Sequence, residues 1–450
     1  MKKEQTRELD LTKGSILPLF ARFTGPIFVS LLFQQLYNMA DTLIVGRFLG
    51  TEALAAVASS GNLIFLLVSF FSGLSTGAGV VIARCFGAGD TERLKKAIHT
   101  NLSLSLLCGV LLTGVGMGLT PTFLRWMNTD PAVLPGAISY FRCYFAGALG
   151  LVIYNSCRGI MTAMGDSRRP LFYLIVSSLL NVGLDLLFVG PMDLNVWGAA
   201  FATVLAQCVS AALCLISLHS KKNLVPLRFS QLRFDRESLR DILKNGLPSG
   251  IQDSVIGFAN VIVQSQINTF GAAAMAAVGT HAKIEGFIFL PVTSLNTTVT
   301  TFVSQNLGAG ETRRARKGAN IGILGACLLA EALGICYYLF APQLISIFDS
   351  STEVIRLGTG LIRTIALFYF LMAFAHSVAA VCRGAGRAFV PMAVMLIIWC
   401  LIRISILMVL MALRVEFQTL FLVYPITWGL SCIFFLIYYL KANWCRAFDH

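Results

Sequence analysis

Five acidic residues lie inside long apolar runs of the sequence: Asp41, Asp185, Asp253, Glu285 and Glu331. A charged carboxylate at the centre of a lipid bilayer costs roughly 2.5–3.5 kcal/mol on insertion scales, so each of these side chains needs a partner or a function. A carboxyl group in such surroundings can take up a proton, and a cluster of oxygen atoms can bind a hard cation such as Na⁺. The chemistry that these residues allow is therefore reversible binding of a proton or a cation.

Other polar side chains share helix faces with two of these acids, because residues three, four and seven apart point the same way on a helix. The resulting stripes are Gln34, Tyr37, Asn38 and Asp41 in the run 16–46, Asn181 and Asp185 in 170–190, and Thr203 and Gln207 in 196–219. Carboxylate, amide and hydroxyl oxygens that converge between helices suit Na⁺ or a shared proton. The alternative is a network that only holds helices together, at about 0.6 kcal/mol per hydrogen bond, and two buried acids are a costly way to build one.

A third stripe, Asp253, Asn260 and Gln264, falls on one face of the run 239–270. We expect Asp253 either to line the path of a substrate or to pack between helices. The residues assigned to a substrate cavity are Gln34, Tyr37, Asn38, Asn155, Gln207, Asp253, Asn260 and Gln264.

His281 and Glu285 are one helical turn apart. An internal ion pair or network is the favoured interpretation of this spacing, with pH sensing or substrate contact as the alternative. Glu331 and Arg363 could form a similar pair, and His376 is interpreted as a hydrogen-bonded packing residue.

The elements that position these residues are predicted to be transmembrane helices. Of the 450 residues, 56% are apolar and only 13% are charged, whereas soluble domains contain about 25% charged residues. Mean hydropathy is +0.75, which excludes an ordinary soluble protein. A spanning helix needs about 20 mainly apolar residues. We therefore predict an all-α polytopic membrane protein with twelve spans, near 16–46, 54–84, 94–119, 131–160, 170–190, 196–219, 239–270, 274–304, 315–340, 355–382, 389–411 and 417–440.

Lys and Arg accumulate in cytoplasmic loops. With twelve spans, 26 of the 35 Lys and Arg fall in the loops and termini of one side, and both termini are then cytoplasmic. The formal net charge of +13 is thus a signature of membrane orientation, with contact to anionic lipids, rather than of nucleic-acid binding. The polar first 15 residues contain no hydrophobic core of a signal peptide, so we expect the first span to insert uncleaved.

The sequence repeats itself at an offset of 221 residues. GAGD at 87–90 matches GAGE at 308–311, Gly50 and the residues after it match Gly271 and its successors, and Gly165 and Pro170 match Gly386 and Pro391. Six spans per repeat is an even number, so the repeats are parallel. We predict an N-lobe at 1–219, a cytoplasmic linker at 220–238 that lets the lobes rock, and a C-lobe at 239–450, with substrate bound between the lobes.

Several chemical classes are excluded by the residues that are missing. HExxH and CxxC do not occur and there are only 5 His, which argues against an enzyme, a cofactor, or a metal site beyond Na⁺ at the acidic cluster. The GAGD and GAGE turns lack a following Lys-Ser or Lys-Thr, so they are interpreted as helix ends rather than phosphate loops.

Together these motifs resemble the multidrug and toxic compound extrusion (MATE) family over essentially the whole chain. The residues that carry the resemblance are GPIFVSLLFQQLYNMADTLIVG ending at Gly46, GTEALAAV at 50–57, the GAGD and GAGE loops, AMGDSRRP at 163–170 and RGAGRAFVP at 383–391. The resemblance implies secondary active efflux of cationic or amphipathic compounds in exchange for H⁺ or Na⁺. It also implies a multi-pass protein of the cell (inner) membrane that contacts small-molecule drugs or organic cations and membrane lipids but no nucleic acid, and we expect a monomer.

The DinF-like branch of this family has a cation site whose matching positions here are Asp41, Asn181, Asp185 and Thr203. Pro26 matches a proline where the first helix bends. The acidic site that the NorM-like branch places in the C-lobe is not clearly matched. The alternative function is a lipid-linked precursor flippase of the same superfamily, which would need a cationic central cavity.

Overall fold

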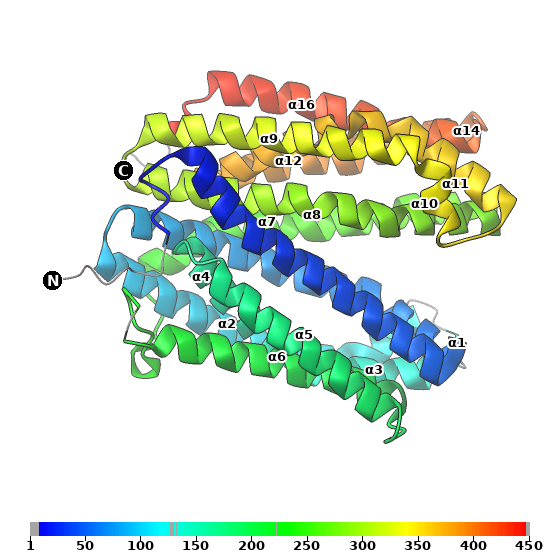
Figure 1. The fold of residues 1–450 in the computed structure, drawn as a ribbon, viewed down its shortest axis with the longest axis horizontal. Helices are drawn as coiled ribbons and strands as arrows, with labels where there is room; N and C mark the ends of the chain where they lie inside the picture. Colours follow the sequence, from blue (N-terminus) through cyan, green and yellow to red (C-terminus); the bar gives the residue numbers. More distant parts are fainter. Residues whose placement is uncertain (1–8, 127–129, 132, 222, 447–450) are drawn as a thin grey trace. The chain divides into compact units, whose positions relative to one another are not determined.

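The computed structural model describes residues 9–446 apart from 127–129, 132 and 222 (Figure 1). All regular secondary structure in the described residues is helical. The chain divides into two compact units, of which unit 1 comprises Met1–Asp10 and Gly25–Gly246, and unit 2 comprises Leu11–Thr24 and Leu247–His450. Both boundaries that separate the units inside helices lie just before a proline, Pro26 or Pro248.

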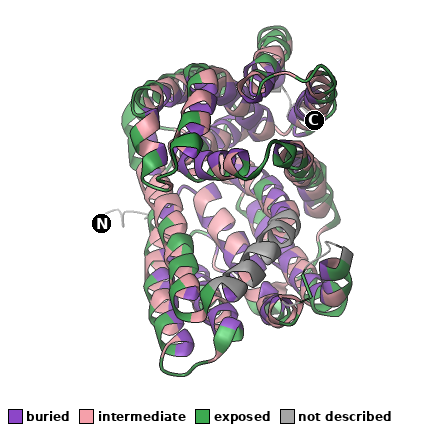
Figure 2. Ribbon diagram, turned by 90° about the vertical axis from the view of Figure 1, so that its right-hand side faces the viewer, coloured by how far each residue is buried: buried purple, intermediate pink, exposed green. Residues whose placement is uncertain are grey.

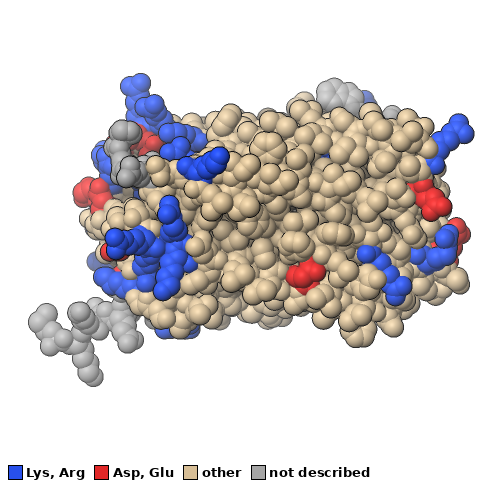
Figure 3. Space-filling model, turned by 90° about the horizontal axis from the view of Figure 1, so that it is seen from above, with Lys and Arg blue, Asp and Glu red and all other residues tan. Residues whose placement is uncertain are grey.

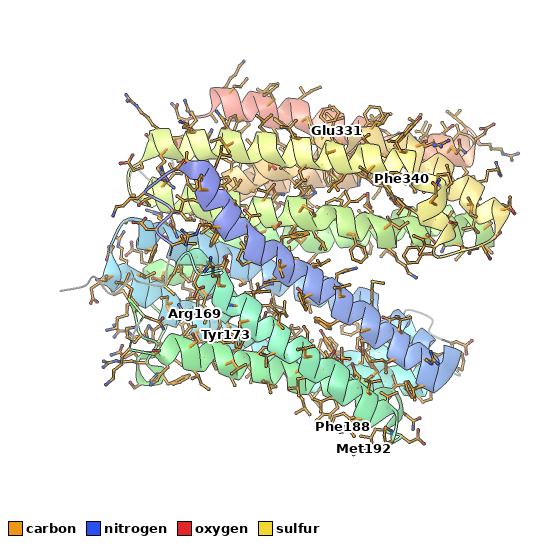
Figure 4. All side chains as sticks on the ribbon, viewed as in Figure 1. Arg169, Tyr173, Phe188, Met192, Glu331 and Phe340 are labelled. Carbon is orange, nitrogen blue, oxygen red and sulfur yellow. The ribbon has the colours of Figure 1, made fainter. Side chains whose placement is uncertain are left out.

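Unit 1 is built mainly from six helical elements, and the first of them consists of two helices joined at a kink where Gly50 has a non-helical φ of 82° and ψ of −170°. They are α1 (Ile16–Gly87), α2 (Thr91–Trp126), α3 (Leu134–Ala146), α4 (Ala148–Ala163), α5 (Arg168–Val189) and α6 (Asn195–His219). α5 packs against α6, while α2 contacts α3 and α4. Arg169 and Tyr173 lie at one end of α5, and Phe188 lies at the other (Figure 4).

Unit 2 repeats this arrangement with more helix interruptions. Its elements are α7 (Arg236–Ile267), η2 (Asn268–Phe270), α8 (Ala272–Gly308), α9 (Thr312–Leu339), α10 (Ala341–Ser346), α11 (Thr352–Ile365), η3 (Ala366–Phe368), α12 (Tyr369–Gly384), α13 (Phe389–Met395), η4 (Leu396–Ile402), α14 (Arg403–Ala412), α15 (Phe417–Leu420), α16 (Val423–Lys441) and η5 (Trp444–Arg446). The first eleven residues of α7 belong to unit 1, as does the short η1 (Phe229–Gln231) before it. η4 is a π-helix, and the other η elements are 3₁₀ turns.

Ten helices in the described residues are long and apolar enough to cross a membrane, or eleven if α3 and α4, bent by 47°, form one span. The all-α polytopic fold is therefore confirmed. α7 is the twelfth expected span. It is long enough, with 32 residues, but the polar stripe of Asp253, Asn260 and Gln264 lowers its hydropathy.

The surface matches a lipid environment. Large apolar side chains such as Leu179, Ile216 and Leu328 are exposed. Exposed and buried positions alternate along the helices (Figure 2). On the face drawn in Figure 3, charged side chains gather toward two opposite ends, and the band between them is almost free of Lys and Arg. This is the distribution that an apolar bilayer core imposes.

The sequence repeat is also a repeat of backbone conformation. Three glycine pairs separated by 221 residues have positive φ, namely Gly50 and Gly271 (82° and 93°), Gly89 and Gly310 (69° and 76°), and Gly165 and Gly386 (89° and 73°). Glycine reaches this region without the steric cost that other residues incur. The same tight turns therefore end matching helices in both halves.

The segment predicted as a free linker is attached to α2. Thr100 on α2 donates to the carbonyl of Arg233 and accepts from the backbone N–H of Asp235, and His99 Nε2 accepts from the backbone N–H of Arg228 at 3.2 Å. Asp235 also accepts hydrogen bonds from Ser238, which lowers its pKa because the ionised carboxylate is the better acceptor. The linker thus belongs to unit 1.

Candidate functional site

The centre of the candidate site is a pair of buried acids in unit 1. α1 carries Asp41 and α5 carries Asp185, whose side chain is fully buried. The two carboxyl groups lie within hydrogen-bond reach of each other. Two ionised carboxylates at this separation repel strongly, so a proton or a cation between them is the stable arrangement.

Asn181 and Thr203 join this pair from neighbouring positions. Asn181 lies one turn before Asp185 on α5 and is 2% exposed. Its Nδ2 donates to Thr203 Oγ1 on α6 at 3.4 Å, and Thr203 Oγ1 in turn donates to the carbonyl of Ala199 at 3.1 Å. The structure therefore brings together the four residues that the resemblance identified as a cation site.

The oxygens of this cluster lack donors. Asp41 Oδ1, Asn181 Oδ1 and both carboxylate oxygens of Asp185 are buried without a hydrogen-bond partner in the described part of the chain. Buried polar atoms are nearly always satisfied, because leaving one unpaired costs about 1–3 kcal/mol. A set of acceptors with no donor is what a proton or a hard cation completes.

The donor set excludes most other ions. Within the described residues, no group of three or more His, Cys, Asp or Glu side chains could hold a metal ion. Two carboxylates, an amide and a hydroxyl, all oxygen donors, fit a proton or Na⁺ and do not fit a transition metal that prefers nitrogen or sulfur.

A ring of tyrosines surrounds the acids, and the sequence analysis missed two of them. Tyr140 on α3 lies close enough to Asp41 and Asp185 to interact electrostatically with both, and it stacks on Tyr144 at 6.3 Å between ring centroids. Their spacing of four residues was a signal, since it places both on one face of α3. Tyr37 contacts Tyr144 and Asp41 electrostatically and hydrogen-bonds Gln34. The three rings therefore lie close to the acid pair.

The remaining predicted cavity residues of unit 1 are divided between two places. Gln207 hydrogen-bonds Tyr144 and so joins the tyrosine ring. Asn38 is exposed on α1. Asn155 lines a separate cavity of about 30 Å³ between α1, α2 and α4, which also contains Ser75, Asn101 and Ser156. That volume accommodates about two water molecules. The hydroxyl and amide groups on its otherwise apolar wall can hydrogen-bond them.

The hinge candidate Pro26 lies inside α1, where its missing N–H interrupts the helical hydrogen-bond ladder. Its carbonyl accepts a hydrogen bond from Ser30 Oγ at 2.8 Å. The boundary between the units falls between Thr24 and Gly25, immediately before this proline. A missing backbone donor in the helix thus coincides with the change of unit.

In unit 2, the predicted stripe on α7 does not act as one site. Asp253 lies close enough to Arg383 on α12 to interact electrostatically. Asn260 is exposed, and Gln264 donates to Asn268 Oδ1 at 2.9 Å. The interpretation of Asp253 as part of a polar pair between helices therefore has a named partner.

The predicted His281–Glu285 network is present. Nε2 of His281 lies 3.6 Å from Glu285 Oε2, and Nδ1 lies 3.0 Å from the hydroxyl of Tyr337. Tyr369 donates to Glu285 Oε1 at 3.1 Å. His376 packs against the rings of Phe289 and Trp399, which confirms its packing role, but no hydrogen bond of its side chain is found among the described residues.

The sequence analysis did not predict the surroundings of Arg403, which interacts electrostatically with Glu285 of this network. Arg403 is 4% exposed, donates to Thr427 Oγ1 at 3.0 and 3.2 Å, and lies over the rings of Trp399 and Tyr424.

The suggested pairing of Glu331 with Arg363 is wrong. Arg363 lies over the ring of Tyr338, whereas Glu331 accepts from the backbone N–H of Phe370.

Comparison with known proteins relates both halves of the chain to membrane transporters. The MatE family model matches residues 26–187 and 248–409, once in each half. The probable multidrug resistance protein YoeA of Bacillus subtilis is 30% identical over 389 residues, which cover 84% of this chain and 84% of that protein. An FAD transporter of Shewanella oneidensis is 25% identical over 327 residues, covering 71% and 72% of the two chains. The crystal structure of a MATE protein in its bent conformation superposes with a TM-score of 0.90 at 25% identity, over 98% of this chain and 97% of that one.

Proposed function

The chain belongs to the MatE family of membrane transporters, and on that premise we propose that it is a secondary active multidrug exporter that exchanges cationic or amphipathic compounds for H⁺ or Na⁺. The observation that carries the proposal is the facing pair of Asp41 and Asp185, with buried oxygens that have no donor in the described residues. Multidrug resistance proteins among the relatives support the substrate class.

Ion binding couples to the helices that carry the ligands. Without an ion, the two carboxylates repel, and Asp41 on α1 is pushed from Asp185 on α5. A bound H⁺ or Na⁺ removes that repulsion and draws α1 toward α5. Since Tyr37 and Gln34 lie on the same stretch of α1 as Asp41, the tyrosine-lined space beside them changes shape when the ion binds. Drug and ion then compete for alternative conformations of unit 1.

One ion per cycle supplies enough energy. Moving a charge through a membrane potential of 100 mV yields about 2.3 kcal/mol, which is roughly fifty-fold in concentration. A single cation site is therefore sufficient for useful export of a neutral compound, whereas exchange of one ion for one monovalent cation moves no net charge and is driven by the concentration gradient of the ion.

The direct experiment is export from proteoliposomes that contain purified protein and a fluorescent cationic dye. A pH gradient and a Na⁺ gradient are imposed separately, with equal membrane potentials. We expect at least one gradient to drive export above the rate without a gradient. Export that neither gradient changes would contradict the antiport mechanism. Movement of a labelled lipid-linked sugar without dye export would favour the flippase instead.

A further expected result concerns Pro26. Replacing it with alanine restores a backbone donor and removes the ring, so α1 should bend less readily. We expect Pro26→Ala to reduce the rate of ion-driven export about ten-fold while dye binding without a gradient stays within about two-fold of wild type. Stopped-flow export and equilibrium dye binding measure the two effects. Pro121→Ala on α2 is the control, because that proline also lies inside a helix but away from the unit boundary. Equal losses in the two variants would contradict a hinge at Pro26.

The orientation is proposed from charge. Lys and Arg concentrate in the loops of one side, which places both termini in the cytoplasm. The same loops are proposed to contact anionic lipids, and the protein is proposed to work as a monomer. Labelling of single cysteines placed in the terminal segments of a cysteine-free variant tests the orientation, since an impermeant reagent should reach them only from the inside of the cell.

A further inference from the structure

The segment between α6 and α7 exposes large apolar side chains outside the candidate membrane spans. Residues 220–235 connect the two helices within unit 1 (Figure 1). Leu224 is 47% exposed, Phe229 53% and Phe234 49%. The preceding candidate span ends at His219, so the apolar core of a bilayer does not account for this exposure. Three such side chains in so short a segment indicate contact with a partner or a membrane surface.

The segment is held in place from its inner side. Val225 and Leu227 are buried in the apolar core of unit 1. The backbone N–H of Leu227 donates to the carbonyl of Leu218 at 2.9 Å, and the carbonyl of Leu227 lies 2.7 Å from His219 Nδ1. The ring of Phe229 stacks on that of His219 with centroids 6.0 Å apart. With the hydrogen bonds to α2 described above, these contacts fix the backbone, so a partner does not have to order it.

An exposed arginine stands directly before each phenylalanine. Arg228 precedes Phe229, and Arg233 precedes Phe234. Residues 220–240 contain six Lys and Arg but only two acids. Clusters of about four to eight Lys and Arg beside a membrane-spanning helix attract anionic lipids, and apolar side chains among them enter the boundary of the acyl chains. The mixture of basic and aromatic side chains is therefore typical of a surface that binds an anionic membrane.

The two acids of the segment do not cancel this charge, because α2 supplies their counterions. Asp235 lies 3.7 Å from Lys96 Nζ, and Glu237 accepts from Arg93 at 2.9 Å. Among the ion pairs of the described residues, none includes the arginine before either phenylalanine. These arginines can therefore bind a negatively charged partner.

The segment before α1 offers an internal comparison. Arg314 on α9 stands 221 residues after Arg93 on α2, and it holds that segment by donating to the three carbonyls from Leu11 to Gly14. The leucines there are not exposed, since Leu9 is half-buried and Leu11 is buried. Attachment by an arginine is thus common to both repeats. Among the described residues of the two segments, only the one before α7 exposes large apolar side chains.

We propose that Leu224, Arg228, Phe229, Arg233 and Phe234 form a docking surface for the anionic leaflet of the membrane. The two phenylalanines enter the boundary between headgroups and acyl chains, and the two arginines bind lipid phosphates. Lipid is favoured over an acidic protein because the segment begins directly after a candidate span, where the phosphates of a leaflet lie. The inference rests on the proposed contact of the basic loops with anionic lipids, and it names the residues and the lipid chemistry of that contact.

Tryptophan fluorescence of the purified full-length protein in nanodiscs tests the surface. Phe229→Trp and Phe234→Trp each place a reporter at an apolar position, and the signal of the five native tryptophans is subtracted with the wild-type protein. The nanodiscs contain equal amounts of phosphatidylcholine and phosphatidylglycerol, with bromine on the acyl chains of one lipid or the other. We expect brominated phosphatidylglycerol to quench both reporters at least about two-fold more than brominated phosphatidylcholine, because the arginines concentrate the anionic lipid there.

Matched variants separate local charge from total charge. Arg228→Gln with Arg233→Gln, in the Phe229→Trp protein, should abolish the preference, so that the two brominated lipids quench equally. Arg313→Gln with Lys317→Gln removes the same charge from exposed residues of α9 and should leave the preference unchanged. Melting temperatures of the four proteins check that each variant is folded.

Three outcomes would overturn the proposal. Quenching of both reporters by acrylamide, with none by either brominated lipid, would place the side chains in water. Equal quenching by the two lipids with both arginines present would show an apolar contact that does not select charge. Stronger protection from acrylamide by polyglutamate in phosphatidylcholine nanodiscs than by phosphatidylglycerol would identify an acidic protein as the occupant. Nanodiscs expose both leaflets and need no ion gradient, so the result is independent of drug export and of orientation in the cell.

Discussion

Asp41→Asn is expected to lower ion-driven export by at least about 100-fold, which corresponds to about 2.7 kcal/mol. Asparagine keeps the size of the side chain but cannot take up a proton at its oxygen or carry the charge that attracts Na⁺. The carboxylate of Asp185 then faces a neutral amide that donates to it permanently. Ion binding then no longer changes the repulsion between positions 41 and 185, so it cannot drive the conformational change, although the protein folds.

Export from proteoliposomes under the gradient that drives the wild-type protein measures this effect, with dye binding and thermal stability as checks on folding. Asp185→Asn should give a loss of the same order, because either change removes one half of the pair. Thr42→Val is the control: Thr42 is the next residue of α1, is exposed, and bonds only the carbonyl of Asn38 among the hydrogen bonds described. Export by Asp41→Asn at the wild-type rate would remove the basis of the proposed mechanism.

Gly77→Ala is expected to lower stability by about 3 kcal/mol or more, the second large effect. A Cβ at Gly77 on α1 would overlap the backbone nitrogen and Cα of Gly246, the eleventh residue of α7. Backbone atoms inside two packed helices cannot move aside as a flexible side chain can. Both residues belong to unit 1, so the change should open that unit where the two helices meet.

Gly79→Ala provides a control on the same helix, since a Cβ there meets nothing within 4 Å. Both variants gain the same helix propensity, about 1 kcal/mol, so any difference between them comes from packing. Fluorescence-detected size-exclusion chromatography after heating compares the two melting temperatures. We expect Gly79→Ala to be as stable as wild type or more so, and Gly77→Ala to aggregate or melt well below it. Equal stability of the two variants would contradict the close approach of α1 and α7.

Features that follow from spacing along the chain were predictable from the sequence. Asp41, Asn181, Asp185 and Thr203 were placed together because residues four apart share a helix face, and the family resemblance chose between possible partners. The repeat was predictable because its turns need glycine, and Gly50 with Gly271 shows why. The polar stripe of α7 was visible too, and it is the reason that this helix falls below the hydropathy of the others.

Features that depend on how helices rotate against one another were not predictable. Arg403 directly follows the π-helix η4 and lies beside Thr427 and two aromatic rings, and no pattern in the sequence predicts a π-helix. A pair of Glu331 and Arg363 was suggested on the assumption that a buried acid forms an ion pair with a base. The structure instead uses it at a helix break, whose orphaned backbone donor is a stronger requirement in lipid. Tyr140 and Tyr144 showed a helix-face signal, but nothing in their spacing pointed toward the acids.

The division of the chain into units has a consequence for how the two halves depend on each other. Residues 16–24 of the first repeat are counted with unit 2, where Phe20 packs on Phe302, and residues 236–246 of the second repeat are counted with unit 1, where Gly246 meets Gly77. The first turns of the first helix of each repeat therefore pack in the unit that the other repeat builds, as in a domain-swapped dimer. A half produced alone would lack a segment that it needs and carry one that it cannot use. The two halves are obligate partners, and co-expressed fragments cut in the segment before α7 should be recovered as a pair or not at all.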